Sequence, residues 1–446
     1  MLVTLNVKFL GQACTLIETG GKRILCDPWI TGPCNVNSWY HLNRRIQTKK
    51  DVPTDVDYIY ISHEHTDHFH SETLKEFDRN IPIFICKFPT DRFYNSIVQE
   101  GFKNITVLNS WEKKSLEKNL EITIIKNSEL MMEDSAIIIK TNEGTIFCQT
   151  DCGMSYESLL RVREEKPDLG FFKFGAANWY PIVYNYDKEK KATICKKRKM
   201  HKMTGFVNYV KVVQPKYAIP YAGPPIFLDK SLLDVNDPNS GMFAVPDEAK
   251  KVWEKEGNNN TKIRIMAPTD EISVNGELTH NEQPVFAHEK MDIVHKLSEE
   301  VEYDIKRRYE FEGTASRNLN NNIIDYFNKI ISENPIARRR IDMKIQFIAE
   351  GKNGGDFVLD FSKDKENGPY AKEGIIDDWS YFMKLPAHLI QKVVNNELLW
   401  ETLFLSCRWT ADRRPDKWNE HLMNLFYDPD PRRIQNIYKI YDKMLS

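Results

Sequence analysis

The stretch VDYIYISHEHTDHFH occupies residues 56–70 and holds four of the 11 histidines of the chain. Its first half is an almost continuous apolar run, which predicts a buried strand. The polar residues begin where that strand ends, and rigid scaffolds display functional side chains at such ends. The stretch therefore predicts a buried strand with a candidate site directly behind it.

The spacing H-x-H-x-D-H within this stretch is typical of a metal site. His63 and His65 are two residues apart, so in an extended segment their imidazoles point to the same side. Asp67 and His68 can supply a second set of ligands after a turn. Neutral imidazoles and a carboxylate suit zinc, iron or manganese, and ligands placed this closely can hold two ions.

The alternative interpretation of the same residues is a solvated histidine-rich loop, or stacked histidines that satisfy one another. The charged neighbours allow it, but the regular spacing directly behind a strand favours the metal site. His70 falls outside the spacing, and we expect it to support the site or to lie at the surface.

The composition indicates a folded protein of two domains. The chain has 446 residues, 41% of them hydrophobic, and domains commonly contain about 100–200 residues. A net charge of −2 gives no global reason to expect nucleic acid or an anionic membrane as partner. No apolar run approaches the ~20 residues that span a bilayer, and the amino terminus lacks the features of a secretory signal. The eight cysteines form no CxxC pair, so we expect reduced thiols in a cytoplasmic protein.

The chain changes character twice along its length. Up to about residue 225, short β-branched or aromatic runs alternate with helical stretches. Residues 226–285 are rich in Pro, Asn, Asp and Gly, which is typical of extended loops. A long polar helix is expected over 289–311, and then a smaller unit with two strands joined by a KNGG turn. The pattern predicts an α/β protein with two sheets covered by helices, and domains at 1–285 and 286–446.

The motif HEHTDH at 63–68 resembles the signature of the metallo-β-lactamase superfamily. Two further segments share the resemblance: KRILCDPW places Asp27 behind a predicted strand, and GTIFCQTDCG places Asp151 behind a later one. The resemblance implies an αββα sandwich, in which Asp27 supports the metal loop and Asp151 bridges two metal ions. By its residues alone, Asp151 is as well explained as the cap of the helix that follows it.

Histidine is absent between His70 and His201, where hydrolases of this superfamily supply a further ligand. We expect the missing ligand in the segment NSELMMED, where Glu129 is best placed. Glu133 and Asp134 are the alternatives, although such acids are usually plain turn residues. A carboxylate in place of imidazole favours iron or manganese over zinc, which points away from simple hydrolysis.

This glutamate also resembles iron-binding members of the superfamily, among them a β-hydroxylase family with a dinuclear iron site that activates dioxygen. Through most of its length the chain is similar to the catalytic part of the cytidine monophosphate N-acetylneuraminate hydroxylase family, as in LCDPWITGP, FGAANWYP and QPKYAIPYAG. The sequence lacks the C-x-H and C-x-x-H pair of a Rieske cluster. The resemblance therefore implies that electrons come from an external electron-transfer protein or from the substrate.

The last histidine ligand of the superfamily is missing too, because the strand KYAIPYAG ends in Pro220, Tyr221 and Gly223. His201 replaces it only if its helix turns inward, and a histidine in a lysine-rich helix usually lies at the surface. The last ligand of the second metal is left open.

The aromatic segment FFKFGAANWYPIVYNY surrounds a centre of small residues. The resemblance implies that Gly175, Ala176 and Ala177 let the backbone approach the metals, while Trp179 and Tyr180 line the pocket. Core packing is the alternative for each aromatic residue.

Two further regions have weaker signals. The basic run over 188–202 could attract an anionic substrate or an acidic electron-transfer protein, but a solvated helix face is the favoured interpretation. Residues from about 300 to 446 resemble the sterol-carrier type fold, which implies a C-terminal α/β sterol-carrier-like domain.

The sequence thus predicts a dinuclear, diiron oxygenase that oxidises a small polar metabolite, with dioxygen as co-substrate. Zinc and manganese are the alternative metals, and the alternative reaction is hydrolysis of a phosphoester, lactone or amide. No nucleic acid or membrane partner is expected. The predicted ligands are His63, His65 and Glu129 for one ion, Asp67 and His68 for the other and Asp151 for both, with Asp67 and Glu129 as catalytic residues.

Overall fold

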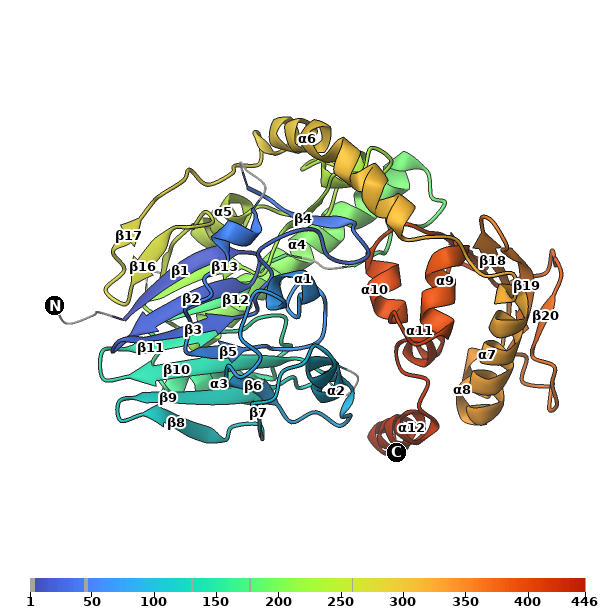
Figure 1. Ribbon diagram of the computed structural model, residues 1–446, viewed down its shortest axis with the longest axis horizontal. Coiled ribbons are helices and arrows are strands. Elements are labelled where there is room, and N and C mark those ends of the chain that lie inside the picture. Colours follow the sequence, from blue (N-terminus) through green and yellow to red (C-terminus); the bar gives the residue numbers. More distant parts are fainter. Residues whose placement is uncertain (1–4, 44–46, 130–131, 176–177, 259, 446) are drawn as a thin grey trace. The chain divides into compact units, whose positions relative to one another are not determined.

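The computed structural model describes residues 5–43, 47–129, 132–175, 178–258 and 260–445. The chain forms two compact units (Figure 1): the first comprises 1–35, 39–177 and 192–302, and the second 36–38, 178–191 and 303–446. The division falls inside helix α6 (Lys290–Phe311), whereas the sequence-based domains divide the chain ahead of that helix.

The first unit contains an eight-stranded sheet of order β17-β16-β1-β2-β3-β5-β6-β7. It begins as an antiparallel meander of β1, β2 and β3, and continues with β5, β6 and β7 parallel to β3. Its strands are β1 (Asn6–Gly11), β2 (Cys14–Thr19), β3 (Lys22–Cys26), β5 (Tyr58–Tyr60), β6 (Ile83–Cys86), β7 (Ile105–Leu108), β16 (Glu271–Ser273) and β17 (Leu278–Thr279).

A seven-stranded sheet of order β15-β13-β12-β11-β10-β9-β8 is built in the same way. Strands β8 to β11 are antiparallel, and β11, β12, β13 and β15 are parallel. Its strands are β8 (Lys113–Glu117), β9 (Leu120–Lys126), β10 (Ser135–Thr141), β11 (Thr145–Cys148), β12 (Leu169–Lys173), β13 (Tyr217–Tyr221) and β15 (Lys262–Ile263). A separate pair joins β4 (Trp39–His41) and β14 (Pro225–Phe227).

Strand β10 shows why this sheet is covered on both faces. Ile137 and Ile139 join the core shared with the first sheet, while Ala136 and Ile138 join a second core on the opposite face. Successive side chains of a strand point to opposite faces, so an unbroken apolar run indicates burial on both sides.

Helices cover the outer faces of the two sheets. α3 (Tyr156–Glu164), α4 (Lys188–Val213) and α5 (Pro246–Glu256) pack on the second core through Val162, Phe206 and Trp253. α1 (Ser71–Leu74) and α2 (Arg92–Gln99) contribute Leu74 and Phe93 to the core of the eight-stranded sheet. The predicted αββα sandwich is thereby confirmed (Figure 1).

The two sheets meet where their strands approach the candidate site. Ser135 donates through Oγ to the carbonyl of Ser62 at 2.8 Å, and the same Oγ lies 2.9 Å from the hydroxyl of Tyr60. These buried contacts fix the end of β5 against the start of β10.

The second unit has a five-stranded sheet of order β20-β19-β18-β21-β22 with its own aromatic core. Trp400 lies 4.9 Å from Phe426 and 6.2 Å from Phe347 between ring centroids. Its strands are β18 (Lys344–Glu350), β19 (Gly355–Asp360), β20 (Ala371–Glu373), β21 (Tyr381–Pro386) and β22 (Thr410–Arg413). Its helices are α7 (Leu319–Glu333), α8 (Pro335–Ile341), α9 (Ala387–Val394), α10 (Trp400–Leu405), α11 (Glu420–Tyr427) and α12 (Pro431–Leu445).

Within the described ranges, none of the helices combines the length and the apolar character needed to cross a bilayer.

Candidate metal centre

Asp27 is the buried support of the candidate site. It follows β3, and its carboxylate accepts hydrogen bonds from the backbone N–H and the Oγ of Ser62, at 2.7 and 2.9 Å. Because β3 and β5 are parallel neighbours, their ends meet at one edge of the sheet. The same carboxylate lies 2.7 Å from Nδ1 of His68. Asp27 thus ties together the strand end and the loop that carries the histidines, as the family resemblance implies.

His68 presents one ring nitrogen to Asp27 and the other to the centre of the site. Its Nε2 is buried, and within the described part of the chain it has no hydrogen-bond partner. Metal-bound histidines usually hold a carboxylate on the ring nitrogen that faces away from the ion. A metal ion could bind this buried nitrogen, which makes no hydrogen bond although Oδ2 of Asp67 lies 3.6 Å from it.

His63 and His65 face each other beside His68. Nε2 of His63 lies 2.9 Å from Nδ1 of His65, and Nδ1 of His63 lies 2.8 Å from Oγ of Ser62. The ring centroids of His63 and His68 are 4.1 Å apart. The first two imidazoles lie next to each other, as both the metal-site and the histidine–histidine interpretations of the sequence require, and their role as ligands stays a prediction.

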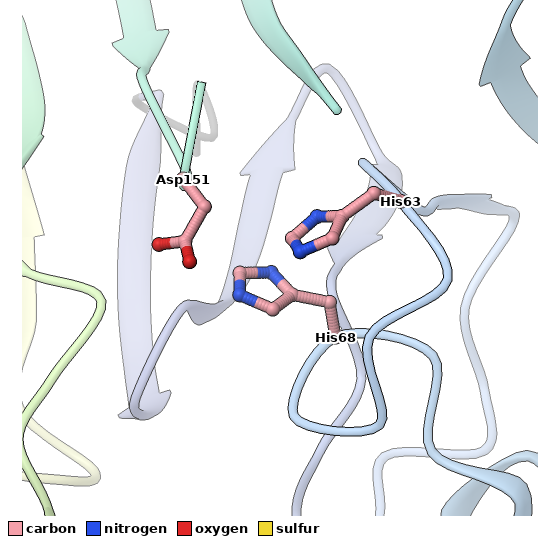
Figure 2. A group of neighbouring side chains, drawn as sticks. All are labelled: His63, His68 and Asp151. Atoms are coloured by element: carbon pink, nitrogen blue, oxygen red, sulfur yellow. The ribbon is translucent and has the colours of Figure 1, made fainter. Parts of the chain in front are cut away.

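Asp151 closes the group from the other sheet. It follows β11, and one ligand atom each from His63, His68 and Asp151 lie within 4.8 Å of one another. Figure 2 shows the two rings and the carboxylate pointing toward a common point. Burial opposes ionisation of Asp151, but Lys173 and His68 outweigh it and lower its pKa to about 2.

Asp67 also lies at the centre. Its Oδ2 is 3.6 Å from Nε2 of His68 and accepts a hydrogen bond from Nε2 of the buried Gln12 at 3.2 Å. Gln12 lies in the turn between β1 and β2, and its left-handed φ of 51° directs it to this point. Its role was not foreseen, since a glutamine in a turn has no signal of its own in the sequence.

The acids of the segment 127–134 have different surroundings. Glu129 is exposed, and its carboxylate lies against Gly153, where an added Cβ would come within 2.9 Å of Oε1. Its role as a ligand stays a prediction. Glu133 is turned away and accepts hydrogen bonds from Thr90 at 3.0 and 2.6 Å.

Asp134, an alternative to Glu129, is buried next to the centre. Burial and the charge of Asp151 raise its pKa to about 6, although Lys173 and a hydrogen bond from Asn127 act in the opposite direction. A carboxyl group with this pKa can change its protonation state near neutral pH.

Lys173, at the end of β12, is a charged residue of the centre that sequence inspection missed. Its Nζ lies 3.1 Å from Oδ2 of Asp151. Burial opposes the ammonium charge, but Asp151 and Asp134 outweigh it and raise the pKa of Lys173. The sequence shows only a lysine at the end of a predicted strand. That lysine points to the metal centre only once the order of the strands in the sheet is known.

The remaining candidates lie away from the centre or support it. His201 is exposed on α4, in line with the surface role expected of it. His70 caps α1, where its Nδ1 accepts from the backbone N–H of Thr73 at 3.3 Å. Tyr221 is buried, and its hydroxyl accepts from the backbone N–H of Thr150 at 2.7 Å. The tyrosine thus braces the loop that carries Asp151.

The small-residue segment is only partly described. Ala176 and Ala177 lie outside the described residues. Trp179 is buried in the second unit, where it packs against Trp409 at 5.1 Å and Phe404 at 5.8 Å between centroids. These contacts favour the core-packing alternative for this residue.

Comparison with known proteins agrees with the fold. Residues 6–157 match the model of the beta-lactamase superfamily domain, and residues 319–443 match that of an Rv3818-like, SCP2-like domain. A protein of Mycolicibacterium smegmatis that bears the name Rieske 2Fe-2S iron-sulfur protein is 24% identical over 441 residues. The match covers 95% of this chain and 84% of that protein.

Hydroxylases are also among the similar proteins. The cytidine monophosphate-N-acetylneuraminic acid hydroxylase of Cricetulus griseus is 28% identical over 49% of this chain and 40% of its own length. The structure of CmlA, a diiron beta-hydroxylase from Streptomyces venezuelae, is similar over 62% of this chain and 54% of that chain, with 16% identity and a TM-score of 0.39. Solved metal-dependent hydrolases are similar to a comparable extent. The chain therefore carries a domain of the beta-lactamase superfamily at residues 6–157 and an SCP2-like domain at residues 319–443.

Proposed function

We propose that this protein is a metal-dependent oxygenase that uses iron and dioxygen to hydroxylate or otherwise oxidise a small polar metabolite. The observation that carries the proposal is the donor set, in which His63, His68 and Asp151 converge on one point. Asp134, which is buried next to Asp151, and Glu129 belong to the segment where hydrolases would add a histidine. A centre rich in carboxylates favours iron over zinc.

The hydroxylase relatives support the same class of reaction. The match to the Cricetulus griseus hydroxylase covers 40% of that protein, so the reaction class is carried over and the substrate is not.

The residues of the centre are proposed to have different roles, either in binding the metal or in supporting a ligand. His63, His68 and Asp151 would hold a metal ion. His65, Asp67 and either Glu129 or Asp134 are the further candidate ligands of the centre. Bound iron would supply the binding and reduction of dioxygen. Asp27 holds His68 through Nδ1, so that Nε2 stays directed at the ion.

Proton transfer is assigned to the acids next to the ligands. Asp134, with a pKa of about 6, can hold or release a proton beside the centre at neutral pH. Gln12 fixes Asp67 by donating to its Oδ2. The predicted catalytic roles of Asp67 and Glu129 are part of the proposal.

The electrons are proposed to come from a separate electron-transfer protein or from the substrate itself. A cytoplasmic location is proposed as well, because all eight cysteines are buried free thiols, which suits a reducing compartment.

Metal analysis combined with oxygen uptake tests the proposal. The full chain is produced without added metal, analysed for iron, zinc and manganese, reduced under anaerobic conditions and mixed with oxygenated buffer. We expect bound iron, an absorption change that oxygen reverses, and oxygen uptake at an electrode. His68→Ala should lose all three, because it removes a buried ligand.

A matched control is His280→Ala, which removes another histidine paired with an aspartate, 2.6 Å from Asp270 and 40% exposed. This variant should keep its iron. Stoichiometric zinc, turnover of bis(p-nitrophenyl) phosphate and no oxygen uptake would contradict the oxygenase and favour the alternative, a metal-dependent hydrolase.

A further inference from the structure

The parallel strands of the second sheet bring a lysine into the metal centre. In the register of β11, β12 and β13, Cys148 pairs with Phe171, and Lys173 pairs with Tyr221. Phe171 belongs to the core between the sheets and Phe172 to the core on the opposite face. Side chains two apart share a face, so Lys173 points toward the first sheet, where the histidines lie.

The ammonium group of Lys173 lies among the carboxylates of the centre. Its Nζ is 3.1 Å from Oδ2 of Asp151, and it interacts electrostatically with Asp134 and Asp67 as well. Lys202 of α4 adds a second, half-buried ammonium that interacts with Lys173 and Asp151. The carboxylate expected to bridge two metal ions already has a fixed cation beside it.

A second metal ion also lacks its last ligand. The position at the end of β13 holds Pro220, which has no donor side chain, and Tyr221, whose hydroxyl is engaged by Thr150. Of the described residues, those predicted to hold a second divalent ion are Asp67, His68 and Asp151, and that ion would lie close to the ammonium group of Lys173. Like charges at contact distance repel strongly where water is excluded.

A single ion suits the donor atoms better. The group that converges, His63, His68 and Asp151, consists of two histidines and one carboxylate. This combination is the one that non-haem iron(II) oxygenases use for a single iron with open positions.

We propose that the centre holds one metal ion, and that the ammonium of Lys173 takes the place of the second. This differs from the dinuclear centre that the sequence predicts. It rests on the proposed function only in that a metal ion binds at His63, His68 and Asp151.

Manganese titration of the full chain tests the inference. The protein is stripped with a chelator and titrated with Mn²⁺, and bound ions are counted by elemental analysis and by electron paramagnetic resonance. We expect one ion per wild-type chain, with the spectrum of an isolated Mn²⁺. In Lys173→Met the affinity for a second ion should rise roughly a thousandfold, since a unit charge at contact distance is removed. The spectrum should then show an exchange-coupled pair.

Two further variants separate charge from damage to the fold. Lys173→Arg keeps the charge and should still bind one ion. Lys216→Met is the matched control, because Lys216 forms a comparable pair with Asp168 at 2.6 Å but is 72% exposed; it should bind one ion. Two coupled ions in the wild type would overturn the inference, whether or not Lys173→Met folds. One ion in a folded Lys173→Met, as shown by its circular dichroism, would overturn the role of Lys173.

The number of bound ions and the uptake of oxygen test the inference and the proposed function separately. One bound iron without oxygen uptake would leave this inference standing and contradict the oxygenase. Two bound irons with oxygen uptake would do the reverse.

Discussion

Among single residues, Asp27 has the clearest role in positioning the metal ligands, because its one carboxylate binds both Ser62 and His68. Asp27→Asn keeps the shape and removes the charge that orients the imidazole. We expect its affinity for metal to fall about 10–100-fold, as for other losses of a support behind a metal-bound histidine. Competition with a chelating dye measures this. Asp57→Asn, which breaks a half-exposed pair with Lys22, is the control, and equal affinities in both variants would refute the role of Asp27.

His68 makes the metal-free protein sensitive to pH. Burial disfavours its charged form, but Asp27 and Asp67 outweigh burial and raise its pKa from 6.5 to about 9. A raised histidine pKa stabilises the fold fully below pH 6.5, and this stabilisation is lost as the pH rises through 9. We therefore expect the melting temperature of the chelator-treated protein to fall over that interval, and to fall less in His68→Gln. A melting temperature that rises equally in both proteins would contradict the assignment.

The residues of the centre differ in how well a sequence can reveal them. His63, His65 and His68 lie in one short motif behind an apolar strand, so local spacing was sufficient to predict that they converge. Gln12 lies in the turn between β1 and β2 and Lys173 at the end of β12, and they become neighbours of the motif only through the arrangement of strands in the two sheets. That pairing depends on contacts far apart in the chain, which local patterns do not contain.

At the scale of elements, β13 shows how a strand end can support a site without supplying a ligand. The hydroxyl of the buried Tyr221 accepts the backbone N–H of Thr150, one residue before Asp151. Tyr221→Phe leaves that N–H buried and unpaired, which should destabilise the metal-free protein by about 1–3 kcal/mol. Urea unfolding measures the loss. Tyr217→Phe removes a hydroxyl near the surface, bonded to the carbonyl of Asn275, and should cost less. Equal losses of stability in the two variants would show that the hydrogen bond to Thr150 contributes no more than a bond at the surface.

The elements themselves were largely predictable. The segment AIII at 136–139 is apolar without interruption, and this part of β10 is buried on both faces, as such a run indicates. The long polar helix expected over 289–311 is α6, Lys290–Phe311. The β13 strand was foreseen too, but the use of Tyr221 depends on the position of the neighbouring loop after β11. The position of this loop follows from the order of the strands in the sheet, which cannot be predicted from local sequence patterns.

At the scale of the whole molecule, the second unit has an aromatic core of its own, so its stability can be changed separately. Trp400 is 3% exposed and packs against Phe426, Phe347 and Phe404. Trp400→Ala removes a large buried side chain, and we expect a loss of about 3–5 kcal/mol in the unfolding of this unit. Calorimetry should show one transition at a lower temperature, while manganese binding by the first unit stays unchanged. Trp418→Ala, at a tryptophan that is 51% exposed in the same unit, should leave both transitions in place. A loss of manganese affinity in Trp400→Ala that matches its loss of stability would mean that the metal centre depends on the second unit being folded.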